Sequence, residues 1–330
     1  MKVLVIRFSS IGDIVLTSPV LRCLKQQLGA EVHFLTKERF ASIVRPNPNV
    51  DRVFALSDSL GEILAPLRRE RYDWVIDLHH NLRSSWVKWA LLRPARSFYK
   101  ANLEKWLLVN LKVDVMPDRH VVHRYLETTH QLGVRYDGQG LDYFIPPDEE
   151  VNPHQWEGPA PPFVAFAIGA HHATKRLPQE KMADVCRHLD LPVVLLGGTE
   201  DALRGAWVAS EIGPRVFNAC GRLTLHQSAS VVRQAAVVLT HDTGLMHIAA
   251  AFRKPIVSLW GSTVPRFGMY PFYPDGPDLN TSIEVQGLSC RPCSKIGYER
   301  CPKKHFRCMC DLDALTIAAA VNNRYRALGG

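Results

Sequence analysis

The sequence predicts an α/β protein with two doubly wound domains, each built on a parallel sheet. Three observations support this prediction: the chain has 330 residues, short apolar runs alternate with amphipathic stretches in both halves, and a proline-rich stretch lies between the halves. A chain of this length exceeds one ordinary core and suffices for two domains of roughly 150 residues each. Strands that alternate with helices favour parallel sheets covered by helices on both faces.

In the first half, a β-branched, apolar run at residues 2–8 indicates a buried strand, and a polar turn at 9–13 leads into a helix that ends at Gly29. Pro19 must either lie in the opening turn of that helix or kink it. The remaining elements expected are strands at 31–35, 50–56 and 74–78 and a charged helix at 60–70. Ligands of such sheets bind beyond the carboxyl ends of the strands, where residues 9–13 and 77–83 lie.

The segment between residues 136 and 162 contains six prolines and no sustained periodicity, as a linker does. We therefore expect a boundary near residue 155, with one domain at 1–155 and a second at 156–330. In the second half the expected elements are a helix at 179–189 and strands at 163–168, 193–198, 216–217, 235–239 and 254–261.

Composition indicates a soluble protein of the cytoplasm. Hydrophobic residues make up 46% of the chain and charged residues 22%. The chain contains no run of about 18 apolar residues, the length that a membrane-spanning helix needs. The apolar run before Arg7 is too short for a signal peptide. Five of the eight cysteines lie between Cys290 and Cys310, unlike the spread of a secreted disulfide framework, so reduced thiols are expected.

The net charge of +8 is concentrated in residues 83–112, which hold seven basic residues and one acidic residue. Tryptophans lie among these charges, an arrangement suited to an anionic membrane interface or to another polyanion, nucleic acid included. The alternative is a pair of amphipathic helices whose apolar faces lie in the core and whose basic faces are solvated.

A strand, turn and helix are predicted around residues 240–251. Asp242 or Thr243 can cap the helix, and Gly244 lets another group approach the backbone closely. The N–H groups of the first helical turn favour an anion such as phosphate. Thr243 and His247 are four residues apart and share one helix face. An ordinary capped helix with a hydrogen-bonded histidine is the alternative.

The stretch after the strand at 163–168 carries Thr174, Lys175 and Arg176. At a strand's carboxyl end these side chains would offer a hydroxyl and two cations to a diphosphate. The chain contains no GxGxxG and no P-loop sequence, which argues against hydride transfer with a dinucleotide and against P-loop use of ATP.

Asp13 follows the first strand, where a helix N-terminus keeps a carboxylate ionised. It can accept a proton from a reacting group or merely cap the helix. His79 and His80 end another strand, but neighbouring residues point in opposite directions, so a shared metal site is not expected.

The cysteine-rich loop at 290–310 contains a Cys-x2-Cys pair, which is half of a zinc knuckle. The spacing of its second half is irregular, so a structural zinc ion and a reduced, loop-stabilising or redox-sensitive cluster both stay open. The candidate zinc ligands are Cys290, Cys293, Cys301 and Cys308. Four thiolates would leave no open coordination position, which argues against catalysis by this metal.

Taken together, five stretches make the chain resemble glycosyltransferase family 9, the ADP-heptose lipopolysaccharide heptosyltransferases. They are residues 5–13 with Pro19, 175–178, 221–225, 242–247 and the Cys-Arg-Pro-Cys segment at 290–293. The resemblance implies a GT-B fold, in which two Rossmann-like domains face a central cleft. The N-terminal domain would bind the acceptor and the C-terminal domain the nucleotide-sugar.

The resemblance also implies a reaction: inverting transfer of heptose from ADP-heptose to an inner-core acceptor of the Kdo–lipid A type, with no metal or other cofactor needed for catalysis. Asp13 would be the catalytic base. The implied donor-binding residues are Thr174, Lys175, Leu223, Asp242, Thr243, Gly244, Leu245 and His247, and the implied acceptor-binding residues are Ser10, Gly12, Arg83, His120 and Arg124. The enzyme would act as a peripheral protein at the cytoplasmic face of the inner membrane on an anionic glycolipid, and no nucleic-acid partner is expected.

The chain departs from the family pattern at two places. Leu177 stands where the family often has tryptophan, and residues 83–112 have no secure counterpart. The alternatives within the fold are a transferase with another nucleotide-sugar or glycolipid acceptor and a nucleotide-sugar epimerase or hydrolase. A nucleic-acid-binding protein is a remote alternative, because it would leave Asp13 and the turn at Asp242 without a role.

Overall fold

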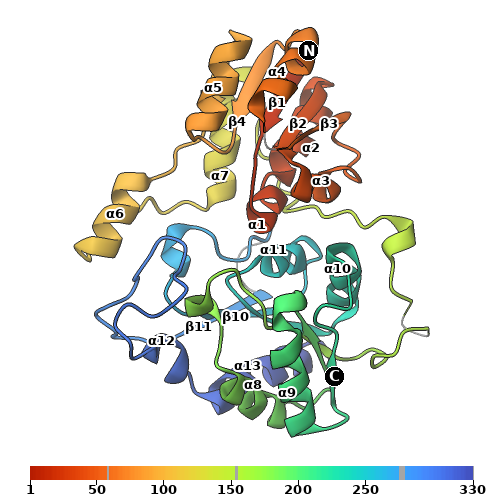
Figure 1. Ribbon diagram of the computed structural model, residues 1–330, viewed down its shortest axis with the longest axis vertical. Helices are drawn as coiled ribbons and strands as arrows, with labels where there is room; N and C mark the ends of the chain where they lie inside the picture. The colour runs from red at the N-terminus through yellow and green to blue at the C-terminus, as the bar shows by residue number, and fades with distance from the viewer. Residues whose placement is uncertain (58, 153–154, 275–278, 330) are drawn as a thin grey trace. The chain divides into compact units, whose positions relative to one another are not determined.

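The computed structural model describes residues 1–57, 59–152, 155–274 and 279–329, and it divides into two compact units (Figure 1). The first unit comprises Met1–Lys100 and Arg119–Phe144, and the second comprises Ala101–Asp118 and Ile145–Gly330. The division thus falls 11 residues before the boundary expected at residue 155, and the excursion at 101–118 packs with the second unit.

The first unit is built on a five-stranded parallel sheet with the strand order β3-β2-β1-β4-β5. Its strands are β1 (Lys2–Ile6), β2 (Glu31–Lys37), β3 (Arg52–Leu56), β4 (Trp74–Asp77) and β5 (Ala95–Ser97). Strands β2 and β3 lie on one side of β1, and β4 and β5 lie on the other. The topological switch point therefore lies between β1 and β4. Their carboxyl ends meet there, since Ile6 pairs with Asp77.

The helices of the first unit include two that were not expected, Glu38–Val44 and Val121–Leu126, and two helices in the stretch expected as one helix up to Gly29. They are α1 (Ile11–Val15), α2 (Ser18–Leu28), α3 (Glu38–Val44), α4 (Leu60–Arg69), α5 (Leu82–Leu91) and α7 (Val121–Leu126), followed by a 3-10 helix at Glu127–Leu132. The helix expected up to Gly29 is divided into α1 and α2, and of the two places expected for Pro19, the opening turn of the helix is confirmed. Thr17 turns back onto the Ile14 carbonyl at the break, and Pro19 occupies the first turn of α2, where its missing N–H costs nothing. Gly29, at φ 57°, ends α2.

The second unit contains a six-stranded parallel sheet with the order β11-β10-β9-β6-β7-β8. Its strands are β6 (Val164–Ala167), β7 (Val193–Leu196), β8 (Val216–Asn218), β9 (Val237–His241), β10 (Ile256–Trp260) and β11 (Asn280–Glu284). Its helices are α6 (Asn102–Asn110), α8 (Gln179–Arg187), α9 (Ala202–Ile212), α10 (Leu225–Gln234), α11 (Gly244–Ala251), α12 (Arg307–Cys310) and α13 (Ala314–Arg326). Here the switch point lies between β6 and β9.

The excursion at Ala101–Asp118 joins the second unit through apolar and ionic contacts. Leu108 and Met116 pack with Phe267 in a small core cluster. Arg266 pairs with Asp114 at 2.7 Å. Among the described residues, no helix has both the length and the apolar character needed to cross a bilayer.

Candidate functional site

In the second unit, two loops leave adjacent strands at the switch point of the sheet. One follows β6 and includes a 3-10 turn, Ala173–Lys175, and the other follows β9 and begins at Asp242. The strands are in direct register, with Ala167 paired to Thr240. As a result Lys175 Nζ lies 2.6 Å from Asp242 Oδ2, and each side chain is 15% exposed. The structure therefore brings together two residues 67 positions apart that were both expected to bind the donor.

The start of α11 lies directly after Asp242. Thr243 is the N-cap, and its Oγ1 accepts a hydrogen bond from the Leu245 N–H at 3.2 Å. Gly244 opens the helix, and His247 is buried one turn later. The Lys175 ammonium is thus accompanied by the positive end of a helix dipole, an arrangement that attracts an anion.

The loop after β6 is fixed by polar contacts of Thr174 and Leu177. Thr174 is buried, and its hydroxyl already contacts Ser262 Oγ at 2.9 Å and accepts from the Tyr298 N–H at 2.8 Å. The Leu177 N–H donates to His241 Nε2 at 3.0 Å. Burial lowers the pKa of His241 to about 3, so this imidazole is neutral and accepts a hydrogen bond. These contacts hold the loop against the end of β9.

Two other predicted donor-side residues lie further along the same edge of the sheet. Leu223 is half-buried between β8 and α10, two strands beyond β6. Arg176 lies 3.7 Å from Asp201, which also pairs with Arg204 at 3.1 Å. Sequence reasoning missed Asp201, because an Asp that follows a Gly-Gly turn has the appearance of an ordinary helix cap.

In the first unit, Asp13 forms an ion pair with Arg7. The Asp13 Oδ1 atom lies 2.7 Å from the Arg7 guanidinium, and Oδ2 accepts from the Ser10 hydroxyl at 2.8 Å and the Ser10 N–H at 3.2 Å. Arg7 also donates to the carbonyls of Ser9 and Leu78. Asp13 therefore belongs to the capping box of α1 and at the same time lies beside a fixed positive charge.

The loop after β4 is organised around the buried Asp77. Its Oδ1 accepts from the backbone N–H groups of His79 (3.0 Å) and His80 (2.7 Å), and its Oδ2 lies 2.8 Å from Lys88 Nζ. Burial by itself raises the pKa of Asp77, but the His80 N–H and the Lys88 ammonium lower it by more, so the net pKa lies below the usual value. Burial and the Arg7 charge lower the pKa of His79 to about 4, so this histidine is neutral.

The residues expected to bind the acceptor lie in three places. Ser10 and Gly12 lie with Asp13 at the start of α1. His120 and Arg124 are buried at α7, whose N-cap is His120. Arg83 is exposed on α5. Sequence reasoning missed Tyr125, whose ring lies 5.8 Å from the Arg7 guanidinium carbon.

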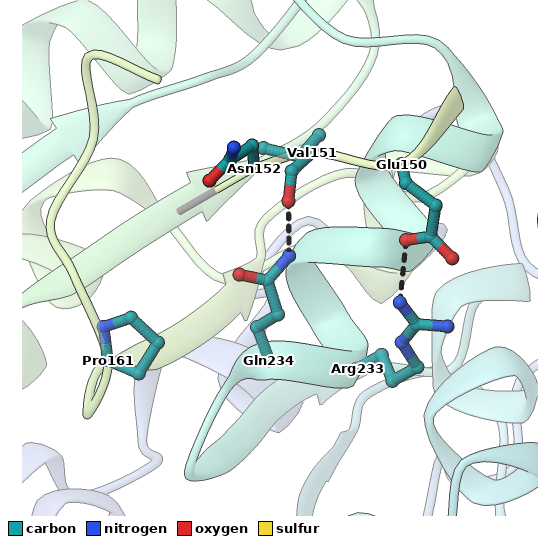
Figure 2. Close-up of a pocket in the computed structure, with 6 residues that line it drawn as sticks. All are labelled: Glu150, Val151, Asn152, Pro161, Arg233 and Gln234. Carbon is teal, nitrogen blue, oxygen red and sulfur yellow. Dashed lines mark hydrogen bonds and ion pairs between the residues drawn. The ribbon is translucent and has the colours of Figure 1, made fainter. Parts of the chain in front are cut away.

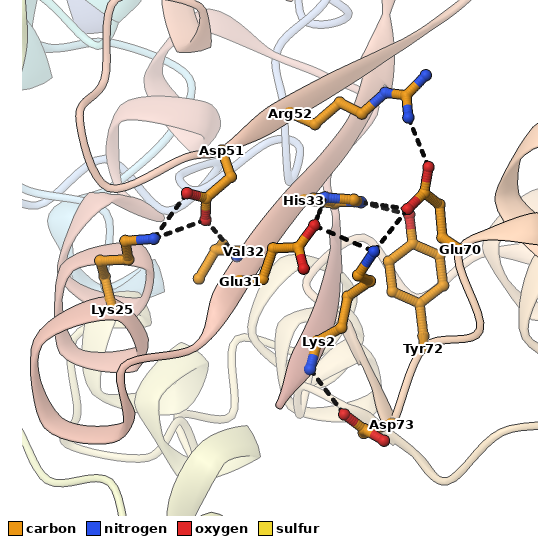
Figure 3. Close-up of polar contacts among 10 residues, drawn as sticks. All are labelled: Lys2, Lys25, Glu31, Val32, His33, Asp51, Arg52, Glu70, Tyr72 and Asp73. Atoms are coloured by element: carbon orange, nitrogen blue, oxygen red, sulfur yellow. Dashed lines mark hydrogen bonds and ion pairs between the residues drawn. The ribbon is translucent and has the colours of Figure 1, made fainter.

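The described residues contain one group of three convergent metal ligands, Glu31, His33 and Glu70 (Figure 3). The Lys2 ammonium lies among them, 3.0 Å from Glu31 and 2.7 Å from Glu70, so a cation already fills this site. No three thiols of the cysteine-rich loop converge in this way within the described parts of the chain, and all eight cysteines are free. Besides burial, the neighbouring thiols of Cys293, Cys301 and Cys290 raise the pKa of Cys308, so these four thiols lie near one another, and a structural zinc ion at Cys290, Cys293, Cys301 and Cys308 stays a prediction.

A pocket of about 550 Å³ is lined by residues 150–152, Pro161 and the end of α10 (Figure 2). Arg233 reaches Glu150 across it at 2.6 Å, and Gln234 Nε2 donates to the Val151 carbonyl at 2.8 Å. These polar groups thus already bond one another, and none of the expected donor residues lines the pocket. The pocket therefore lies where residues 150–152 pack against α10.

Comparison with known proteins decides the family. The model of glycosyltransferase family 9 (heptosyltransferase) matches residues 61–297, well over half of the chain. The chain belongs to glycosyltransferase family 9. This family 9 protein is a glycosyltransferase, and its two α/β units have the GT-B fold, so the expectations of family, fold and reaction class are confirmed.

Relatives and solved structures agree with this assignment. The chain is 24% identical to lipopolysaccharide heptosyltransferase 2 of Escherichia coli K12 over 294 residues, 81% of this chain and 84% of the relative. The structure of E. coli ADP-heptose lps heptosyltransferase II is similar with a TM-score of 0.76 at 20% identity, over 100% of both chains. An E. coli heptosyltransferase solved with ADP has a TM-score of 0.69 at 21% identity, over 98% of this chain and 100% of the other.

Proposed function

We propose that this family 9 enzyme transfers heptose from ADP-heptose to a lipopolysaccharide inner-core acceptor of the Kdo–lipid A type, with inversion at the anomeric carbon and without a catalytic metal. The observation that carries the proposal is the Lys175–Asp242 pair, 2.6 Å apart beside the N-terminus of α11. It is a preformed anion site at the switch point of a parallel sheet, where such sheets bind nucleotides. The names of the relatives supply the sugar and the acceptor class.

On the donor side, the Lys175 ammonium stays oriented by Asp242 and donates its remaining N–H groups to the diphosphate of ADP-heptose. The Gly244 N–H, which opens α11, is proposed to face the same anion, with Thr243, Leu245 and His247 shaping the turn. Thr174 holds the loop in place, and Leu223 extends the same edge toward the nucleoside. Negative charge grows on the leaving diphosphate in the transition state, and the fixed cation and helix dipole stabilise it there.

On the acceptor side, Asp13 removes the proton from the attacking hydroxyl. The hydroxyl oxygen then forms a bond to the anomeric carbon while the bond to the diphosphate breaks, and ADP leaves with the electron pair. Arg7 fixes the direction of the Asp13 carboxylate, because its guanidinium is itself held by the Ser9 and Leu78 carbonyls. Ser10, Gly12, Arg83, His120 and Arg124 are proposed to bind the acceptor.

The enzyme meets its lipid acceptor at a membrane surface, and the outer face of α5 supplies a contact for this surface. Leu82 (90% exposed), Trp86 (42%) and Trp89 (71%) lie along that face, and Leu92 (80%) follows the helix. No carboxylate occurs between Leu78 and Leu103, whereas arginines at 83, 93 and 96 are exposed. Exposed tryptophan beside arginine fits an anionic phospholipid interface, in keeping with a peripheral enzyme of the inner membrane's cytoplasmic face.

The experiment that tests this function is a transfer reaction with purified protein, ADP-heptose and Kdo-bearing lipid A, read by mass spectrometry of the lipid. We expect the acceptor to gain one heptosyl residue in the presence of a metal chelator. Replacement of ADP-heptose by UDP- or GDP-sugars should abolish the product. Transfer from one of those sugars in preference to ADP-heptose would contradict the donor assignment, and loss of transfer with the chelator would contradict metal independence.

A further inference from the structure

The loop that follows β10, Gly261 to Thr263, contacts both loops of the donor site. The Ser262 hydroxyl pairs with Thr174 Oγ1 at 2.9 Å, and the Ser262 N–H donates to the Thr174 carbonyl at 3.2 Å. Thr263 Oγ1 donates to Asp242 Oδ2 at 2.8 Å. Asp242 Oδ2 is therefore shared between Thr263 and the Lys175 ammonium. The position of this third loop determines where Thr174, Asp242 and Lys175 lie.

Arg291 holds this third loop. Its guanidinium donates to four backbone carbonyls: Gly261 (2.6 Å), Val285 (2.8 Å), Thr263 (3.1 Å) and Trp260 (3.2 Å). It also forms an ion pair with Glu284 at 2.7 Å, and its side chain is 7% exposed. Only arginine offers five donors in a rigid planar fork, so no other side chain can satisfy this set of acceptors.

The turn that carries Arg291, Cys290 to Cys293, is fixed from both sides. The Cys293 N–H donates to the Ser262 carbonyl at 2.9 Å, which ties the turn to the same loop. From the excursion at 101–118, Lys112 Nζ donates to the carbonyls of Cys290 (3.1 Å) and Pro292 (2.8 Å). The backbone on either side of Arg291 is therefore held in place, and its guanidinium fixes the position of the Gly261–Thr263 loop.

We propose that Arg291 is a positioning residue of the donor site: it fixes the Gly261–Thr263 loop and thereby sets the geometry of Thr174, Asp242 and Lys175. This inference rests on the proposed function, in which Lys175 binds the donor diphosphate while Asp242 orients Lys175 and Thr174 holds the loop. When the loop is released, Asp242 loses the Thr263 hydroxyl, and the Lys175 ammonium loses the fixed carboxylate that orients it. The donor site then opens without the loss of any residue that touches the donor.

The test compares three variants of the full chain by calorimetric titration with ADP. Arg291→Lys keeps a positive charge near Glu284 but cannot bridge the four carbonyls. Glu284→Gln removes the charge of the ion pair and leaves the carbonyl contacts in place. The matched control is Arg215→Lys, because Arg215 also donates to two carbonyls, of Leu189 and Asp190, but lies before β8 at the opposite edge of the sheet.

We expect Arg291→Lys to raise the Kd for ADP by about tenfold, which is the loss of roughly one well-aligned charged hydrogen bond. Glu284→Gln and Arg215→Lys should bind ADP as the wild type does. If Arg291 merely stabilises the fold through its ion pair, Glu284→Gln will weaken ADP binding as much as Arg291→Lys does. That result, or wild-type affinity in Arg291→Lys, would overturn the proposal.

Hydrogen exchange separates this inference from the proposed function. In Arg291→Lys, peptides that cover residues 256–264 should exchange faster, because the Ser262 N–H loses its fixed partner at Thr174. In Arg215→Lys they should exchange as in the wild type. If the wild type binds no ADP, the donor assignment fails, and the exchange result alone decides whether Arg291 positions the loop: unchanged exchange in Arg291→Lys refutes it.

Discussion

Asp13→Asn removes the proposed base and keeps its shape. The asparagine retains an oxygen for the Ser10 N–H but loses the charge that pairs with Arg7 at 2.7 Å. Loss of one partner of a buried ion pair costs about 3–5 kcal/mol. Asp13 is 19% exposed and Arg7 keeps two carbonyl partners, so we expect a smaller loss of about 1–3 kcal/mol. Turnover should fall by about 10²- to 10⁴-fold, the usual contribution of a general base.

A matched control separates the two effects of this substitution. Asp137→Asn in the same unit also breaks a carboxylate contact with a buried arginine, because Asp137 lies 2.6 Å from Arg22. Arg22 keeps Asp142 and the Gly140 carbonyl, so the loss of stability should be comparable. We would measure thermal unfolding, ADP affinity and ADP release with saturating acceptor. If Asp13→Asn keeps turnover equal to that of Asp137→Asn, Asp13 is not the base.

Three further outcomes are expected. Trp89→Ser should weaken sedimentation with phosphatidylglycerol vesicles by about tenfold, whereas Leu203→Ser, at an 87% exposed position of α9, should not; equal losses would refute the α5 surface. His241 has a pKa of about 3 in the folded protein against the ordinary 6.5, so on acidification the unfolded chain takes up the proton first. The neutral His241 therefore contributes fully to stability above pH 6.5, and this contribution declines below pH 6.5 by up to about 1.4 kcal/mol per pH unit. Melting temperatures at pH 7.5, 6.0 and 5.0 should fall more steeply in the wild type than in His241→Gln. Gly261→Ala places a Cβ 2.6 Å from the Thr174 carbonyl oxygen, so calorimetry should show weaker ADP binding, and wild-type affinity would contradict the packing.

Much of the fold could be predicted because short stretches of sequence indicate the individual strands and helices. Buried parallel strands are continuous apolar runs, so β1 and β9 stand out, and their alternation with helices predicts parallel sheets. The start of α2 is predictable from Pro19, which favours the opening turn of a helix, whereas the short helix α1 before it has no separate signal. The sequence places residues 101–118 in the first domain, whereas they pack with Phe267, about 150 positions further along the chain. The spacing of residues in a sequence does not indicate which distant residues pack together.

The candidate site could be predicted only where a single turn presents its residues. Thr243 and Gly244 begin a helix after a strand, which has a local signature. The pairing of Lys175 with Asp242 required the strand order, which places β6 beside β9. Arg291 lies in the Cys-Arg-Pro-Cys segment that supports the family resemblance, but its role gives no sequence signal, because four of its five acceptors are backbone carbonyls, which every sequence contains.

The measurement that tests the central claim most directly is calorimetric titration of the full chain with ADP, UDP and GDP, repeated with Lys175→Ala. Lys25→Ala is the control, because Lys25 forms a similar contact with Asp51, at 2.7 Å, in the first unit. We predict selective binding of ADP to the wild type and to Lys25→Ala, and affinity about tenfold or more lower in Lys175→Ala, where Asp242 faces the diphosphate without its cation. Binding of UDP or GDP in preference to ADP, or unchanged affinity in Lys175→Ala, would contradict the account.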